Sequence, residues 1–298
     1  MKFSLSFLGT DVTQLPLPGT YGNEAVEAII FNRKDLKENP WNETWKSIRK
    51  AISLYGSDNV SFHFPVSNSD YIREQFVRER VAEGLRRSND LGLRSMVIHS
   101  NQMSPIAYWQ EANFEDIRKQ IIDILANISS KHGGKTWLTL ENMPVMDNDG
   151  AIIDPLFVFP SDFQGLLTTN VKVVWDICHY TNSITNIGQV VQGKQKKEYY
   201  PNFQQVGLLD FLKIKDLIVH WHFSAFKGIA NPDTDEITVE GFVPAKSTLG
   251  EELYDKIIKE IFLHQSPGEH MVFEVQEIDY HKRIEGKKMI QWAKSRGK

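Results

Sequence analysis

The chain has 298 residues, of which 41% are hydrophobic and 24% are charged, and its formal net charge is −4. This composition is typical of a water-soluble globular protein, and the net negative charge argues against nucleic-acid binding through bulk charge. The only cysteine is Cys178, so no intrachain disulfide can form, which favours a reducing cytoplasm. The N-terminus lacks the long apolar core of a signal peptide, and no run approaches ~18 apolar residues. We therefore expect a cytoplasmic protein that does not engage membranes.

Short apolar runs, rich in β-branched and aromatic residues, recur along the chain and predict strands. They cover residues 3–8, 25–31, 60–63, 95–99, 137–141, 171–176, 217–222 and 271–274. Helix is a competing interpretation for 25–31. Between the runs, helical spacing of apolar residues predicts amphipathic helices over 41–54, 72–85, 114–128 and 253–262, with Asn113 placed to cap the third. The second helix would bury one face made of Ile72, Phe76, Val77, Val81 and Leu85.

Strands that alternate with helices in this way predict an α/β protein, a closed (β/α)8 TIM barrel. No low-complexity segment or linker rich in proline, glycine and serine divides the chain, so we expect a single domain over residues 1–298. An open doubly wound sheet is the rival architecture. The chain has neither the Gly-x-Gly-x-x-Gly pattern nor the phosphate-loop lysine that would support it.

Metal-ligating residue types stand at the ends of successive predicted strands. The stretch 171–180 shows the pattern, because its apolar run ends in Asp176 and His179 follows three residues later. In a barrel, strand ends at the carboxyl face share one rim, where functional groups gather. Carboxylates crowded there repel unless a cation lies among them. We therefore predict a site for one or two divalent ions (Mn, Zn, Co or Mg), held by His63, His99, Glu141, Asp176, His222 and Glu274.

These motifs resemble the xylose-isomerase-like superfamily of barrels, which includes sugar isomerases and epimerases as well as type IV apurinic endonucleases. The matching segments are His63-Phe64-Pro65, Val97-Ile98-His99, Leu140-Glu141-Asn142, Asp176-Ile177-Cys178-His179, His220-Trp221-His222 and Phe273-Glu274. The resemblance implies that a catalytic cation is held by Glu141, Asp176, His222 and Glu274. In the endonuclease branch, a second cation would lie on His63, His99 and Glu141.

His220 and His222 share strand parity, so both should point into the barrel. We favour His222 as the ligand because it lies nearer the strand end, with His220 packed one layer below. The resemblance implies that His179 contacts substrate in the isomerase branch and a third metal in the endonuclease branch. The endonucleases complete that third site with an Asp-x-His pair. In this chain the corresponding residues are Pro244-Ala245-Lys246. Asp233, Asp235 and Glu236 are alternative ligands in the same loop.

Two lysines are expected to face substrate. Lys246 would replace the positive charge of the missing third metal beside His179. Lys227 stands where the epimerases usually carry an arginine after the seventh-strand histidine. Together with His179 and His220, these lysines form the predicted substrate-binding set.

Three functions remain open. The favoured one is a metal-dependent isomerase or epimerase of a sugar, sugar phosphate or polyol, in which Glu141 and Glu274 move a proton to and from an enediolate. The alternative is an endonuclease IV-like phosphodiesterase acting at abasic sites, which would make DNA the partner. The third is a barrel that binds metal without catalysis. The oligomeric state stays open, and a homo-oligomer is one outcome.

Overall fold

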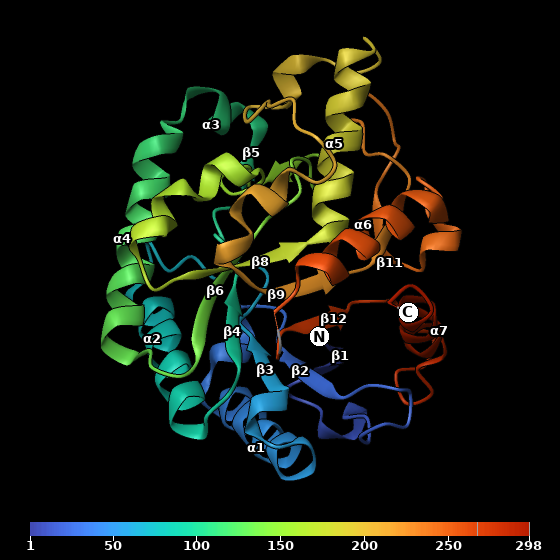
Figure 1. Ribbon diagram of the computed structural model, residues 1–298. Helices are drawn as coiled ribbons and strands as arrows, with labels where there is room; N and C mark the ends of the chain where they lie inside the picture. Colours follow the sequence, from blue (N-terminus) through green and yellow to red (C-terminus); the bar gives the residue numbers. More distant parts are fainter. Residues whose placement is uncertain (267, 298) are drawn as a thin grey trace.

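The computed structural model describes residues 1–266 and 268–297. Eight parallel strands close into a barrel (Figure 1), which confirms the predicted (β/α)8 architecture and the strand interpretation of residues 25–31. In the order of their pairing around the barrel, the strands are β1 (Lys2–Leu8), β12 (His270–Phe273), β9 (Ile218–Phe223), β8 (Lys172–Asp176), β6 (Trp137–Glu141), β4 (Ser95–Ile98), β3 (Val60–His63) and β2 (Ala25–Ile29).

Helices surround the barrel (Figure 1), and each long helix carries buried apolar residues along one face. They are α1 (Glu38–Tyr55), α2 (Gln75–Leu91), α3 (Ile106–Glu111), α4 (Phe114–His132), α5 (Ile177–Val191), α6 (Glu251–His264) and α7 (Ile284–Lys294). In α1, the buried rings of Trp41 and Trp45 pack on Phe62 of β3, with ring centroids 5.9 and 5.3 Å away. Between β6 and β8, the 3-10 segment Pro160–Thr168 takes the place of a longer helix.

The predicted helix over 72–85 begins later than its apolar spacing suggests. The Asp70 carboxylate accepts hydrogen bonds from the backbone N–H groups of Ile72 and Arg73, so these residues form a turn and α2 starts at Gln75. Phe76 therefore leaves the buried face and is 40% exposed, with the Arg80 guanidinium 5.4 Å from its ring centroid. Of the other residues of the predicted face, Val77, Val81 and Leu85 are buried and Ile72 is partly buried.

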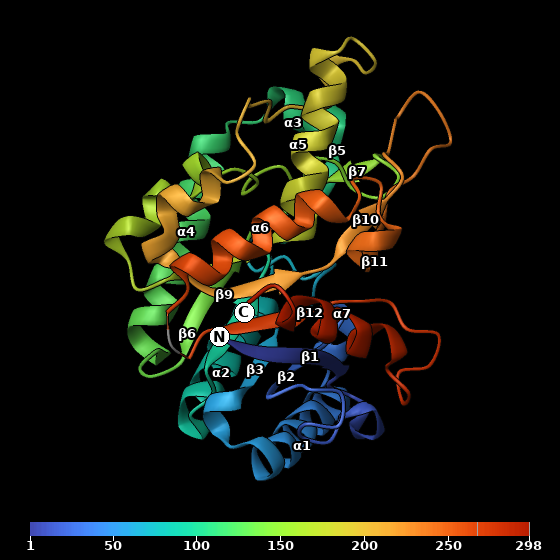
Figure 2. The same cartoon turned by 45° about the vertical axis from the view of Figure 1, so that its right-hand side comes forward.

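Two short antiparallel pairs lie outside the barrel sheet: β10 (Ala225–Lys227) with β11 (Val239–Phe242), and β5 (Ser104–Pro105) with β7 (Ile152–Ile153). Figure 2 shows β9 pointing toward the β10–β11 hairpin, so this hairpin stands at the carboxyl face. The structure thus adds a wall to the rim where the strand ends meet. Within the described ranges, no helix is both long and apolar enough to cross a membrane.

Candidate metal centre

The residues predicted at the strand ends meet at one rim of the barrel. They stand at or within one residue of the ends of six strands: His63, His99, Glu141, Asp176, His222 and Glu274. The parallel register pairs Asp176 of β8 with His222 of β9. Because strand parity alternates, both side chains enter the barrel interior.

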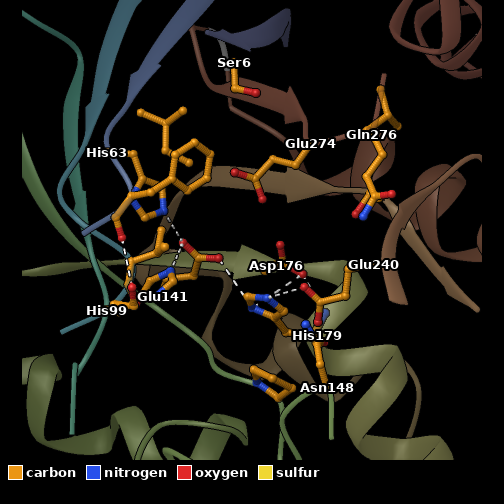
Figure 3. A pocket seen from close by; sticks show the side chains of 18 of the residues that line it. Ser6, His63, His99, Glu141, Asn148, Asp176, His179, Glu240, Glu274 and Gln276 are labelled. Carbon is orange, nitrogen blue, oxygen red and sulfur yellow. Dashed lines mark hydrogen bonds and ion pairs between the residues drawn. The ribbon is translucent and has the colours of Figure 1, made fainter. Parts of the chain in front are cut away.

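One cluster surrounds His222. Its Nδ1 atom lies 3.2 Å from a Glu141 oxygen and 3.4 Å from a Glu274 oxygen. The nearer Asp176 oxygen is 4.0 Å from the same nitrogen. Figure 3 shows the carboxylates of Glu141, Asp176 and Glu274 converging on one space. One ligand atom from each of the four residues lies within 4.8 Å of the others, which is a spacing that a single cation can bridge.

Asn142 fixes Asp176 in this cluster. The Asn142 side chain accepts a hydrogen bond from the backbone N–H of Asp176 at 2.7 Å and donates one to its carbonyl at 3.0 Å. The Asp176 carboxylate also caps α5 by accepting from the backbone N–H of His179 at 2.6 Å. The transition from β8 to α5 therefore places both the carboxylate and the first turn of the helix at the rim.

A second cluster consists of His63, His99 and Glu141. The Nε2 atoms of the two rings lie 3.0 and 3.2 Å from the same Glu141 oxygen, Oε2. The Nδ1 atoms face backbone carbonyls, that of Phe64 at 2.7 Å from His63 and that of Val66 at 3.3 Å from His99. A carbonyl can only accept, so each Nδ1 carries the proton and, in the neutral ring, each Nε2 presents a lone pair.

The donor atoms of both clusters fit divalent ions. Lone pairs on Nε2 of His63 and His99 face a carboxylate, which is repulsive unless a proton or cation lies between them. His99 Nε2 and His222 Nδ1 are buried and make no aligned hydrogen bond. Backbone carbonyls orient the imidazoles of His63 and His99 through Nδ1, as is typical of histidines that bind metals. The mixed imidazole and carboxylate set suits zinc or manganese.

The electrostatics of the rim reflect this crowding. Burial, together with the neighbouring carboxylates of Glu141 and Glu274, raises the pKa of Asp176 to about 7. Burial opposes ionisation of Glu141, but the imidazoles of His222 and His99 outweigh it and hold the pKa of Glu141 well below its usual range. Burial also raises the pKa of Glu274. Without a cation, the carboxylates therefore compete for protons, and a bound ion would replace those protons.

His179 lies between the metal-type clusters and the β10–β11 hairpin. Its Nδ1 is 2.8 Å from the Asn142 carbonyl, and its Nε2 is 3.4 Å from the Glu240 carboxylate of β11. Burial disfavours the imidazolium, but Asp176 and Glu240 outweigh it and raise the pKa of His179 well above the usual value. The ring is thus placed to donate from Nε2 into the cavity.

A fully buried carboxylate, Glu27 of β2, lies beneath the centre. One oxygen is 3.1 Å from Nε2 of His222, and the other is 3.0 Å from Nε2 of His220. Ser61 donates a 2.8 Å hydrogen bond to the latter oxygen. His220 therefore occupies the predicted layer below His222. Burial opposes the charge of Glu27, but the two imidazoles hold its pKa well below the usual range.

The rim opens into a cavity of about 570 Å³. Its acidic lining residues are Glu141, Asp147, Asp176, Glu240 and Glu274. Neutral polar groups and aromatic rings also line it, among them Ser6, Gln14, Asn148, Gln276, Phe31 and Tyr280. Neither lysine nor arginine occurs among the described residues of this lining. The cavity is therefore electronegative and suited to cations and to neutral polar ligands.

The structure does not bring the two predicted lysines into this cavity. Lys246 lies 3.1 Å from the Glu285 carboxylate, and its side chain is 56% exposed. Lys227 is exposed at the end of β10. Nor does Asp233 replace the third-metal ligands, because its carboxylate lies 3.1 Å from the Lys196 ammonium on the surface. The acid that reaches His179 is Glu240, from the same loop region.

Three acidic residues of the site, Glu27, Asp147 and Glu240, are not predicted from the sequence. The sequence does contain an indication of the role of Glu27. A single acid inside the apolar run 25–31 has to be paired if that run is a barrel strand. For Glu240 there is no such indication, because its position depends on how the β10–β11 hairpin folds over the rim.

Comparison with known proteins supports the fold. No protein-family model matches the chain, and no curated protein sequence matches it. Among solved structures, a D-tagatose 3-epimerase-like protein is 15% identical with a TM-score of 0.59, covering 100% of this chain and 98% of its own. Endonuclease IV from Thermus thermophilus is 12% identical with a TM-score of 0.60, covering 99% of this chain and 100% of its own.

A xylose isomerase-like TIM barrel protein from Mycobacterium smegmatis, in complex with magnesium, is 11% identical with a TM-score of 0.56, covering 97% of this chain and 89% of its own. The chain therefore has the fold of the xylose-isomerase-like barrels. Its structural neighbours include both an epimerase-like protein and an endonuclease.

Proposed function

We propose that the chain is a divalent-metal-dependent isomerase or epimerase of a neutral sugar or polyol. The observation that carries this proposal is the cavity lining, in which Glu141 and Glu274 share a metal-type cluster while neither lysine nor arginine occurs among the described lining residues. A phosphate group on the substrate would meet five acidic side chains and, within the described lining, no lysine or arginine, so the imidazolium of His179 would be left to oppose their charge. Hydroxyl groups would find neutral partners in Ser6, Gln14, Asn148 and Gln276.

The chain's own residues can carry out the proton transfer. Glu141, Asp176, His222 and Glu274 would hold the ion, which supplies Lewis-acid polarisation of a carbonyl and its neighbouring hydroxyl. Glu274 is the most accessible of the three carboxylates, with 24% of its side chain exposed. This partial exposure leaves the carboxylate within reach of a substrate carbon from which it could take a proton. Glu141, on β6, would return the proton from its own position, and His179 would donate to a substrate oxygen.

The test is exchange of a carbon-bound proton. Metal-loaded protein incubated in D2O with a panel of unphosphorylated ketoses and keto-glycosides should incorporate deuterium next to the carbonyl, followed by NMR. Phosphorylated counterparts in the same panel should exchange much more slowly. Protein with Zn or Mn bound that exchanges no proton in any neutral sugar would contradict the proposal.

One observation favours a phosphodiesterase as the second candidate. Glu141 belongs to both clusters, so the site can hold two ions on a shared carboxylate, an arrangement that suits phosphodiester hydrolysis. Against this stand the acidic cavity and the chain segment 244–246, which lacks the Asp-x-His pair of the endonucleases. Nicking of a duplex with one abasic site, absent with an intact duplex and without proton exchange in sugars, would establish this alternative.

A further inference from the structure

The barrel interior beneath the proposed metal centre carries a polar cluster that the proposed reaction does not use. Glu27, Ser61, Ser95 and His220 come from four neighbouring or facing strands and are all buried. Barrel interiors are ordinarily filled by bulky apolar side chains. A buried carboxylate in this place costs free energy unless its oxygens are paired.

Glu27 connects this cluster to the metal centre through His222. The imidazole of His222 has Nδ1 among the centre's carboxylates, and its Nε2 is 3.1 Å from a Glu27 oxygen. Both nitrogens of His222 are therefore within hydrogen-bonding distance of a carboxylate oxygen, although the N–H at Nε2 does not point straight at Glu27. A proton on Nε2 faces an acceptor, whereas a proton on Nδ1 would occupy the position that a cation needs. Glu27 thus favours the tautomer in which Nδ1 has a free lone pair.

The other contacts of Glu27 hold its carboxylate in place. Ser61 donates to the second oxygen at 2.8 Å, and His220 Nε2 lies 3.0 Å from that oxygen. The opposite nitrogen of His220 is 3.0 Å from the Ser95 hydroxyl. Like that of His222, the Nε2–H of His220 faces the Glu27 carboxylate without pointing straight at it. The Ser95 hydroxyl then donates to Nδ1, and the protons of both rings face Glu27. The cluster is then self-consistent with one proton on each imidazole.

We infer that Glu27 is a positioning residue that orients His222 and sets its tautomer for metal binding. The inference rests on the metal centre of the proposed function. The same three side chains could be considered as ligands of a separate ion, since Glu27, His220 and His222 each offer an atom within 4.8 Å of the others. With both sites filled, however, His222 would have to give up both ring protons, whereas the positioning arrangement leaves each imidazole neutral.

The experiment compares Glu27→Gln with the parent. An amide keeps the shape but replaces one accepting oxygen by an N–H2 group, so one of the two imidazoles loses its acceptor. Zinc affinity, measured by chelator competition, should fall by about 10- to 100-fold, and the number of ions per chain should stay the same. Nitrogen-15 NMR of labelled histidines should show the Nε2–H tautomer of His222 in the parent and its loss in the variant.

The matched control is Glu269→Gln. Glu269 is a buried carboxylate at the opposite end of the barrel that accepts a 2.8 Å hydrogen bond from Trp221 Nε1. This change should leave zinc affinity unaltered. If Glu27→Gln does not fold, Ser61→Ala removes one of the contacts that hold Glu27 and should lower zinc affinity several-fold.

Each outcome separates the inference from the function on which it rests. A parent chain that binds no divalent ion refutes the proposed function. Unchanged zinc affinity in a folded Glu27→Gln variant overturns the positioning role while leaving that function intact. Loss of one whole ion per chain, with the remaining affinity unaltered, also overturns it, because Glu27 would then be a ligand.

Discussion

Glu141 is the residue whose substitution best tests the two-cluster geometry. It contributes to the set with Asp176, His222 and Glu274 and to the set with His63 and His99. Each ion bound at 100 times its Kd stabilises the folded state by about 2.7 kcal/mol, so two sites give about 5 kcal/mol. At roughly 2 °C per kcal/mol for a chain of this size, saturating zinc should raise the parent's Tm by about 10 °C.

Three variants separate the contributions of the two clusters to this rise in Tm. Asp176→Asn and His99→Ala each damage one cluster, so each should keep about half of the zinc-induced rise in Tm. Glu141→Gln damages both and should keep almost none. The assay is thermal unfolding monitored by circular dichroism, with and without zinc, alongside metal analysis of the folded protein. A Glu141→Gln chain that retains half of the rise would refute the shared carboxylate, and an Asp176→Asn chain that retains none would mean that only one ion binds.

Three further outcomes are expected. Glu274→Gln should lower kcat for the neutral-sugar substrate by about 10³-fold while the circular dichroism spectrum stays the same, since it replaces the proposed base with an amide that cannot take a proton; activity within tenfold of the parent would exclude that role. Burial raises the pKa of Asp154 from 3.8 to about 6, so the folded state binds more protons than the unfolded state between these two values. The free energy of unfolding should therefore fall by about 3 kcal/mol as the pH rises from 4 to 7. In urea unfolding of the metal-free protein, Asp154→Asn should lose this part of the pH dependence. Lys246→Ala should change kcat/KM by less than about twofold and the free energy of unfolding by about 0.5 kcal/mol or less, since Lys246 and Glu285 form a partly exposed pair outside the cavity. A tenfold loss of kcat/KM would restore the predicted contact of Lys246 with substrate.

The barrel and its rim could be predicted because their signals are local. Each strand is an apolar run that ends at a ligand-type residue, and in a parallel barrel the ends of such runs have to meet. Strand parity also placed His220 one layer below His222 without knowledge of any contact. The first residue of α2 could not be predicted in this way, because a side-chain turn at Asp70 competes with apolar spacing.

The β10–β11 hairpin, which forms a wall of the cavity, could not be predicted from the sequence for a different reason. Glu240 reaches His179 only because β11 folds back on β10 over the rim, and the sequence carries no local mark of that approach. Lys246 was predicted to neutralise the substrate beside His179. It follows the hairpin instead, and its side chain pairs with Glu285 in the first turn of α7. Loop residues are positioned by tertiary packing, so their assignment requires the structure.

The polar barrel interior links the fold to the metal. Glu27, His220 and His270 occupy positions that apolar side chains could fill, and both ring nitrogens of His270 lack a partner among the described residues. Such an interior lowers the stability of the metal-free chain, because the barrel core loses apolar burial and contains desolvated charge. Ions that bind only the folded chain would return that stability. Metal binding and folding should therefore be coupled in this protein, and removal of the ions should lower the Tm by the roughly 10 °C that saturating zinc restores.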